Sequence, residues 1–235
     1  MLQIKNLTKK YAKDFKAVDD LSLTVAAGEI YGFIGHNGAG KSTTIKSVVG
    51  ALDFEEGDIL IDGKSVKTEP IECKSITAFV PDNPDIYDHL TGMQYINFIC
   101  DLFGVGKERN ELVKKYADEF ELTKNLGDVI SSYSHGMKQK LVLISALIHS
   151  PKLLVLDEPF VGLDPLASHK LKEIMKEFCA AGGAIFFSSH VLEVVEKLCD
   201  RVGIIKQGKL VKEGNVQEII GDKSLESLFL EIQNG

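Results

Sequence analysis

The chain has no tryptophan, only four cysteines among 235 residues, and no excess of positive charge. The cysteines stand far apart, so their spacing predicts neither a zinc site nor a disulfide framework, and we expect buried free thiols in a reducing compartment. The formal net charge of -7 disfavours a nucleic-acid binder, which usually presents a basic face. We therefore expect no nucleic-acid partner, although binding a nucleotide needs only local positive potential.

Long hydrophobic runs are also missing. No apolar run approaches the roughly 18 residues of a membrane span, and the first segment, MLQIKNLTKKY, alternates like a strand and lacks the apolar block of a signal peptide. We therefore expect a soluble protein that stays in the cytosol. With 44% hydrophobic and 26% charged residues, the chain can bury one large core with a satellite lobe.

The pattern of apolar residues changes twice along the chain. Three early segments alternate like strands: Leu2–Leu7, Val18–Val25 and Glu29–Ile34. A tight Asp62-Gly63 turn predicts a hairpin, and helical periodicity dominates from about Leu90 to His149. After Pro151, strands alternate with helices, which predicts βαβ units and a parallel sheet with an inserted helical lobe.

The strongest motif matches the phosphate-binding loop G-x-x-x-x-G-K-[ST]: Gly35, His36, Asn37, Gly38, Ala39, Gly40, Lys41 and Ser42. A strand pattern precedes it and a helical pattern starts at Lys41. Glycines let successive N–H groups face one concavity, and the helix N-terminus adds positive potential. We expect Lys41 to span the β- and γ-phosphates, Ser42 to bind Mg²⁺, and Thr43 to join the nucleotide site. A Gly-rich turn without a ligand is the disfavoured alternative.

A pair of carboxylates follows the apolar strand Lys152–Leu156: Asp157 and Glu158. Ligands of parallel sheets lie beyond the carboxyl ends of the strands, so the pair would lie beside the phosphate loop if the two strands are neighbours. Successive strand residues point opposite ways, so Asp157 is expected to serve Mg²⁺ and Glu158 to orient and deprotonate the attacking water. Taken alone, an adjacent acid pair is usually a solvated turn.

A second polar cluster ends the strand pattern before His190. From spacing alone, His190 either belongs to the same site or simply caps the helix that starts at Val191. The residues leave these two alternatives open.

Taken together, these segments resemble the nucleotide-binding domain of the ABC transporter family over nearly the whole chain. The most specific segment, Tyr133-Ser134-His135-Gly136-Met137-Lys138-Gln139, resembles the signature loop Leu-Ser-Gly-Gly-Gln, which other P-loop classes lack. The resemblance implies that Ser134 and Gly136 contact the ATP of a second copy.

Further positions match the family. Asp164, in Gly162-Leu163-Asp164-Pro165, lies in the loop that follows the acid pair, and His190 matches the switch histidine. Tyr11 matches the aromatic residue that stacks on adenine, with an ordinary strand-edge tyrosine as the alternative. The closing segment Ser224–Phe229 resembles the tail of single-domain subunits that serve drug, bacteriocin or lantibiotic exporters and related ABC-2-type systems.

Three departures from the family pattern stand out. His135 replaces the first glycine of the signature and Met137 its glutamine. Asp82 holds the position of a glutamine that normally follows an apolar strand, so we expect it in the catalytic and metal-binding set in that residue's place. Lys140 stands where an arginine often follows the signature.

The resemblance implies an α/β fold with a P-loop NTPase core and parallel sheet, an N-terminal antiparallel β subdomain and an inserted α-helical lobe. Within one domain of residues 1–235, residues 1–85 and 150–235 would form the core with its β subdomain, and residues 86–149 the lobe. The implied ligands are ATP and Mg²⁺. The implied partners are a second copy, facing head to tail, and an integral membrane permease at the inner face of the cell membrane. Asp85–Leu90 is the candidate wall of the permease groove, with core packing as an equal alternative.

Two other functions are compatible with the motifs. One is a soluble ABC-type ATPase acting on ribosomes or DNA, which a single phosphate loop, the lack of sustained heptads and the acidic balance disfavour. The other is a regulatory module that binds ATP without hydrolysing it. Intact Glu158 and His190 speak against that module, while Asp82 keeps it open.

Overall fold

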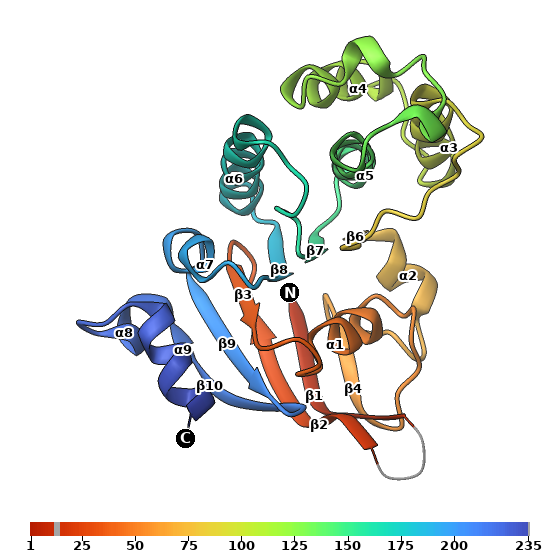
Figure 1. Ribbon diagram of the computed structural model, residues 1–235. Coiled ribbons are helices and arrows are strands. Elements are labelled where there is room, and N and C mark those ends of the chain that lie inside the picture. Colours follow the sequence, from red (N-terminus) through yellow and green to blue (C-terminus); the bar gives the residue numbers. More distant parts are fainter. Residues whose placement is uncertain (12–14, 235) are drawn as a thin grey trace.

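The computed structural model describes residues 1–11 and 15–234, and in these ranges the chain forms two β-sheets with helices around them (Figure 1). The smaller sheet has the strand order β2-β1-β4-β5 and the larger the order β10-β9-β3-β8-β7-β6. The predicted α/β fold is confirmed, including its antiparallel N-terminal sheet, its parallel strands and its helical insertion.

The smaller sheet is antiparallel. Its strands are β1 (Leu2–Tyr11), β2 (Phe15–Val25), β4 (Glu56–Ile61) and β5 (Lys64–Ser65). The hairpin between β4 and β5 turns at Asp62 (φ 52°) and Gly63 (φ 82°). Positive φ at both central residues is what a two-residue type I′ turn requires, so the predicted hairpin is confirmed.

The larger sheet is mostly parallel. Its strands are β3 (Ile30–Ile34), β6 (Thr77–Val80), β7 (Leu153–Asp157), β8 (Ala184–Ser188), β9 (Arg201–Lys206) and β10 (Lys209–Asn215). Only β10 among them is antiparallel to its neighbour. Every residue of β3, β7 and β8 is buried, as in parallel sheets that are covered on both faces.

The condition stated for the acid pair, that its strand is a neighbour of the strand before the phosphate loop, is not met. The strand before the phosphate loop (β3) and the strand before the acid pair (β7) are not neighbours, because β8 lies between them. Both strands nevertheless pair in parallel with β8, so their carboxyl ends reach the same edge of the sheet. The loops that follow them can therefore still meet there.

Three helices gather beyond β6 and β7 at one end of the molecule (Figure 1): α3 (Gly92–Leu102), α4 (Arg109–Glu119) and α5 (His135–Ile148). The others are α1 (Lys41–Val48), α2 (Pro70–Ser75), α6 (Pro165–Ala180), α7 (Leu192–Leu198), α8 (Val216–Ile220) and α9 (Leu225–Asn234). Across the described residues, no helix combines the length and the apolar character that crossing a membrane requires. The sequence did not predict α2, β10, α8 or α9.

Two clusters of buried side chains hold these layers together. One lies between the larger sheet and the helices α3, α5, α6 and α7, and the other lies between the larger sheet, the smaller sheet and α1. Because side chains alternate along a strand, β3 contributes Ile34 to the first cluster and Phe33 to the second. The end of β3 is thereby fixed from both faces immediately before the phosphate loop.

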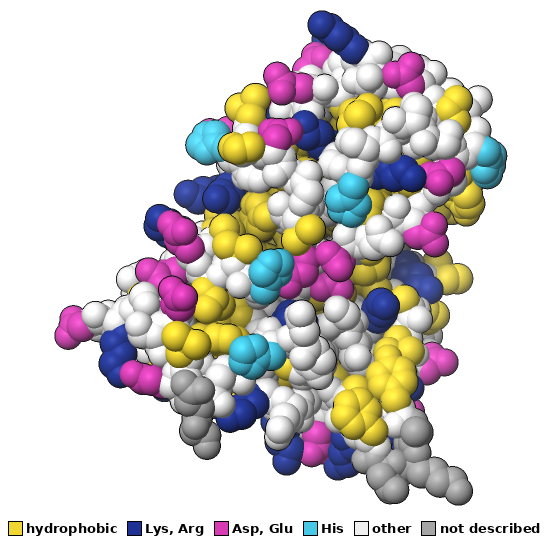
Figure 2. Space-filling view, in the orientation of Figure 1, with side chains coloured by type: hydrophobic (Ala, Val, Ile, Leu, Met, Phe, Trp, Pro, Cys, Tyr) yellow, Lys and Arg dark blue, Asp and Glu magenta, His cyan; other side chains and the backbone are white. Residues whose placement is uncertain are grey.

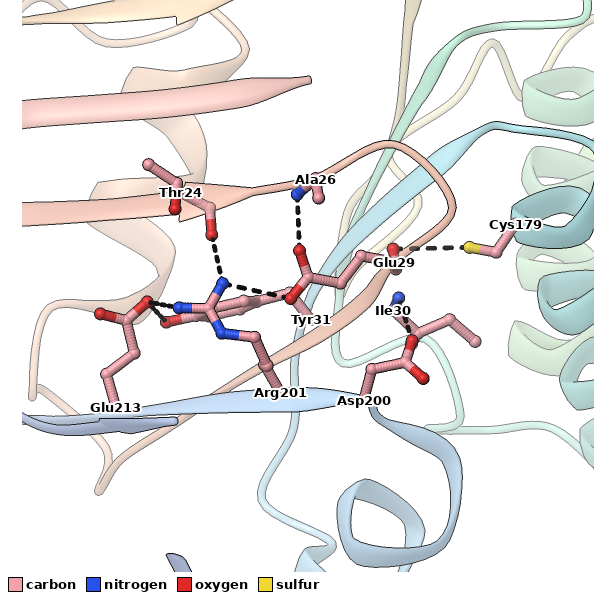
Figure 3. Close-up of polar contacts among 9 residues, drawn as sticks. All are labelled: Thr24, Ala26, Glu29, Ile30, Tyr31, Cys179, Asp200, Arg201 and Glu213. Atoms are coloured by element: carbon pink, nitrogen blue, oxygen red, sulfur yellow. Dashed lines mark hydrogen bonds and ion pairs between the residues drawn. The ribbon is translucent and has the colours of Figure 1, made fainter. Parts of the chain in front are cut away.

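A partly buried charge network joins the two sheets at the opposite end of β3 (Figure 3). Arg201 donates through Nη1 to the Thr24 carbonyl (3.0 Å) and to Glu29 Oε1 (3.2 Å), and its Nη2 lies 2.6 Å from Glu213 Oε1. The Tyr31 hydroxyl donates to the same Glu213 oxygen. The Glu29 side chain is only 8% exposed, and removing one partner of a buried ion pair costs about 3–5 kcal/mol. The network therefore holds β2 firmly against β3 and β9.

The four cysteines all fall in the described ranges and are free thiols, as expected. Cys73, Cys100 and Cys179 are buried, and Cys199 is half-buried. Burial raises the pKa of the Cys179 thiol to about 12, so this side chain stays protonated and packs as a small apolar group.

Candidate active site

The phosphate-loop motif forms the turn between β3 and α1, as predicted, and two of its glycines cannot be replaced without moving the backbone. A Cβ on Gly40 (φ 112°) would lie 2.4 Å from the Ala17 carbonyl oxygen, and a Cβ on Gly35 would lie 2.6 Å from that of Ile205. The loop is thus wedged between β2 and β9. Gly38 has a positive φ of 78° in open space, so glycine there serves the turn alone.

Lys41, the first residue of α1, is buried beneath this loop. Its Nζ donates to the carbonyl oxygens of Gly35 (2.6 Å) and His36 (3.3 Å). Burial lowers the pKa of Lys41, and the negative charges of Glu158 and Asp157 partly offset that effect. The ammonium group is therefore held in place at the bottom of the loop, close to the acid pair.

A pocket of about 320 Å³ opens over the loop. It brings together most of the residues that the sequence singled out, and its lining is Tyr11, Phe15, Ala17, His36, Asn37, Gly38, Gly40, Lys41, Ser42, Thr43, Asp82, Asp157 and Glu158. Gly35 and Ala39, the other two residues of the motif, are buried and do not line this pocket. The face that carries this pocket also shows Asp, Glu and His side chains gathered near its centre (Figure 2).

Phe15 is a pocket residue that the sequence analysis missed. It pairs with Tyr11 across β1 and β2, and both aromatic side chains are exposed, Tyr11 by 43% and Phe15 by 62%. Exposed aromatic side chains are costly to leave in water unless something covers them. Only the pairing of the two strands reveals Phe15, because nothing in its own sequence context marks it.

The acid pair lies at the inner end of the pocket, and its two side chains make different contacts. Asp157 is buried and accepts a hydrogen bond from the Ser188 hydroxyl (2.5 Å). Glu158 has a positive φ of 50°, which turns the chain directly after β7. Its backbone N–H donates to the same Ser188 hydroxyl (3.1 Å). Ser188, at the end of β8, therefore holds both acids.

His190 lies against Glu158, although it is not among the residues that line the 320 Å³ pocket. Its Nδ1 lies 2.8 Å from Glu158 Oε2, and its backbone N–H donates to the same oxygen (3.1 Å). The alternative reading, a cap for the following helix, is wrong, because the Val191 N–H is taken by Ser189 Oγ and α7 has no side-chain cap. The Glu158 side chain is only 14% exposed, whereas that of His190 is 59% exposed.

The segment that resembles the signature loop lies outside this pocket. Ser134 is exposed and caps α5, accepting a hydrogen bond from the Met137 N–H (3.2 Å). The helix thus begins at His135. A Cβ on Gly136 would lie 2.5 Å from the Gly162 carbonyl oxygen, so the start of α5 packs directly on the loop after the acid pair.

Two departures from the family pattern have structural partners in that loop. The His135 ring packs over Gly162, where a Cβ would meet the ring at 2.5 Å. Lys140 forms an ion pair with Asp164 (2.7 Å), and this contact lowers the pKa of Asp164. Asp164 also caps α6, accepting from the Ala167 N–H (2.8 Å). Asp164 does not line the pocket of its own chain.

Three oxygen donors of the pocket suit a magnesium ion. Ser42, Asp82 and Asp157 line it together, and Mg²⁺ prefers hydroxyl and carboxylate oxygens supplemented by phosphate and water. Within the described residues, no group of three or more His, Cys, Asp or Glu is arranged to hold a metal ion by itself. The donor set therefore fits a metal that arrives with a phosphate ligand.

A second hollow, of about 350 Å³, lies between the core and the helices α3 and α5. Its wall includes Ala51, Phe79, Ile99 and Phe103. The predicted groove wall, Asp85–Leu90, is not part of it, because the hollow is lined by α3, α5 and β6. In that segment Ile86 and Leu90 pack on the core, whereas Tyr87 is 53% exposed.

Comparison with known proteins identifies the architecture around these sites. The sequence profile of the family described as ABC transporter matches residues 18–161. The chain belongs to the ABC transporter family. It is similar to the ABC-type transporter ATP-binding protein EcsA of Bacillus subtilis, with 34% identity over 99% of this chain and 96% of that protein. It is also similar to the bacitracin transport ATP-binding protein BcrA of Enterococcus faecalis, with 34% identity over 93% of this chain and 70% of that protein.

Solved structures agree with this assignment. One described as the ATP-binding subunit of an ABC transporter superposes with a TM-score of 0.95, at 33% identity and with 99% of each chain covered. The protein is thus an ATP-binding subunit of this family and an ATPase.

Proposed function

We propose that this subunit hydrolyses ATP as a head-to-tail homodimer and powers export through a separate integral membrane permease at the inner face of the cell membrane. The observation that carries the proposal is the division of the site. The phosphate loop, Asp157 and Glu158 share one pocket, whereas Ser134 and Asp164 are exposed outside it. A second copy would bring the missing residues to each pocket.

In the proposed complex, ATP lies along the pocket from the aromatic pair to the acid pair. Tyr11 and Phe15 would stack on adenine, since base–aromatic stacking needs only exposed ring faces. The N–H groups of Gly35–Thr43 and the N-terminus of α1 would surround the phosphates. Lys41 would neutralise charge on the β- and γ-phosphates.

We assign Glu158 as the general base and His190 as the residue that orients it. Glu158 is mostly shielded from water and is held at one oxygen by the ring and the N–H of His190. Its other oxygen is not used in these contacts and can accept a proton from water positioned against the γ-phosphate. His190 also reaches the surface, where a second copy would contact it.

Ser42, Asp157 and Asp82 are the proposed ligands or near neighbours of Mg²⁺. When bound with ATP, the ion supplies positive charge that balances the phosphate oxygens. Asp82 is exposed at the pocket rim, and unlike the glutamine usual in the family it only accepts hydrogen bonds when ionised. Its charge should favour the metal and repel a phosphate that comes without one.

Asp82→Ala should raise the Mg²⁺ concentration needed for half-maximal ATPase activity, because one negative charge leaves the metal side of the pocket. Binding of metal-free ATP should be unchanged or slightly tighter. Asp82→Gln is the matched control and should be tolerated. Titrating ATPase activity against Mg²⁺ at fixed ATP measures the midpoint. An unchanged midpoint in Asp82→Ala would show that the carboxylate points to solvent and merely caps the turn between Pro81 and Pro84.

For the permease, we propose the apolar hollow between the core and the helices α3 and α5 as the docking site. A helix–loop segment of a membrane protein can insert large apolar side chains there. Exposed Tyr87 and Phe98, which contact each other edge to face at 5.8 Å, would extend the same surface. Transport is proposed by analogy with the bacitracin transport relative, and its outward direction from the resemblance of Ser224–Phe229 to the tail of exporter subunits.

Purification of the tagged subunit from its native membranes tests this proposal. Ala51 is exposed and lies at the hollow, so Ala51→Arg should block docking without burying a charge. Ile71→Arg is the control, since Ile71 is 79% exposed on α2 and not part of the hollow. Wild type and the control should bring down one integral membrane protein, and Ala51→Arg should lose it while keeping ATPase activity. Equal recovery with all three would overturn the docking site, and recovery with none would overturn the permease partner.

A further inference from the structure

The last helix, α9, is fixed to the core at both of its ends. At its start, the Leu225 N–H donates to Glu196 Oε2 on α7 (2.7 Å). At its end, Lys206 Nζ donates to the carbonyl oxygens of Ile232 (2.9 Å) and Gln233 (3.3 Å). These are backbone groups that have no partner within the helix itself, and a cation also suits the negative end of the helix dipole.

Between these two attachments, α9 presents an aromatic side chain to the phosphate loop. Phe229 is 8% exposed, and its ring centroid lies 5.1 Å from that of His36 with the ring planes inclined by 59°. This separation and tilt are within the range in which aromatic rings attract each other. The C-terminal helix thus touches the nucleotide-binding loop directly, from outside the ATP pocket.

His36 links that contact to the lysine of the loop. Its ring rests on Phe229, while its carbonyl oxygen accepts hydrogen bonds from Lys41 Nζ (3.3 Å) and from the Ala39 N–H (3.0 Å). His36 is otherwise exposed. The position of the His36 ring therefore depends on its contact with Phe229, and the position of the His36 carbonyl group depends on the shape of the loop.

We propose that α9 positions the phosphate loop for ATP, with Phe229 acting as a positioning residue through His36. The hydrogen bonds from Glu196 and Lys206 fix the two ends of α9 and thereby the position of Phe229. Phe229 in turn fixes the ring of His36, whose carbonyl oxygen accepts a hydrogen bond from Lys41. The proposal rests on ATP binding at this loop. It assigns the closing segment of the chain a role in nucleotide affinity rather than in folding alone.

Loss of the ring contact should weaken ATP binding about two- to tenfold, which is the factor that the energy of one aromatic pair corresponds to. The contact acts only by raising the fraction of molecules whose phosphate loop has the shape that binds ATP. The maximal rate at saturating ATP should stay within about twofold, because the hydrogen bonds that hold Glu158 come from His190 and Ser188 and not from α9. The KM for ATP should rise in parallel with the dissociation constant.

A double-mutant cycle in the full-length protein tests the inference. Phe229→Leu keeps an apolar side chain for the packing of α9 but removes the ring, and it is made in the wild type and in His36→Ala. Leu230→Ala, at a neighbouring position that is 51% exposed, is the control. A fluorescent ATP analogue gives the dissociation constant, and thermal melting shows whether each variant is folded.

Phe229→Leu should weaken nucleotide binding in the wild-type background and have almost no further effect in His36→Ala, since interacting residues are non-additive. The same fold-change in both backgrounds, or no change in the wild type, would overturn the role of Phe229. Failure of the wild type to bind the analogue would overturn the ATP site itself.

Discussion

Glu158→Gln should lower the rate of ATP hydrolysis by about 10²- to 10⁴-fold, the usual contribution of a general base, while ATP still binds. Glutamine has the same shape and can keep the contact with His190, but it cannot take a proton from water. Phosphate release at saturating Mg²⁺ and ATP gives the rate, and a fluorescent ATP analogue gives the affinity. The dimer that ATP joins should accumulate in this variant.

The matched control for that experiment is Glu193→Gln. Glu193 is on the neighbouring helix α7, is 76% exposed and pairs only with Lys197, so its loss should leave hydrolysis unchanged. A Glu158→Gln variant with wild-type turnover would contradict the assignment of Glu158. Loss of ATP binding in that variant would instead show that Glu158 supports the nucleotide rather than the water.

Lys41→Ala and Ser134→Ala should each abolish turnover alone, and a mixture of the two proteins should recover part of it. If Ser134 serves the ATP of the opposite copy, a mixed dimer combines both defects at one site and leaves the other site intact. With random pairing in a symmetric dimer, about a quarter of the wild-type activity should return. Steady-state ATPase activity as a function of mixing ratio measures it.

A Lys41→Ala/Ser134→Ala double variant mixed with wild type is the control for that recovery, because such a mixed dimer has one defect at each site and no intact site. At equal proportions about a quarter of the wild-type activity should remain, because only the wild-type pairs keep intact sites. About half of the activity, together with no recovery in the first mixture, would place Ser134 at the nucleotide of its own chain, because each mixed dimer would then keep one intact site. About a quarter in the control with no recovery in the first mixture would mean that the two sites work only as a coupled pair, which a structure with ATP would separate from an incorrect arrangement.

The sequence predicted those parts of the site that depend on local chemistry. Glycines at 35 and 40 are needed because carbonyl groups of β2 and β9 leave no room for a side chain, and this requirement appears in the sequence as a motif. The acid pair was equally visible, because a buried strand that ends in two charges must end at a polar site. Spacing alone could not decide whether His190 belongs to the site or caps the following helix. Its contact with Glu158 favours a place in the site.

Features that depend on distant pairing could not be predicted. Phe15 is marked only by its strand partner Tyr11, and the order of β3, β8 and β7 is a property of the whole sheet. Sequence left open whether Asp85–Leu90 faces a groove or the core, because large apolar residues look alike in either place, and in the structure Ile86 and Leu90 pack on the core while Tyr87 is exposed. The contact between Phe229 and His36 joins residues that are far apart in the chain.

In the proposed mechanism ATP joins two copies of this chain, each completing the site of the other. Light scattering on Glu158→Gln measures this directly as a molar mass, because the variant should bind ATP without consuming it. With saturating Mg²⁺ and ATP the mass should be that of a dimer, and with ADP or without nucleotide that of a monomer. A monomer at saturating ATP, with binding of the nucleotide verified in the same sample, would contradict the account.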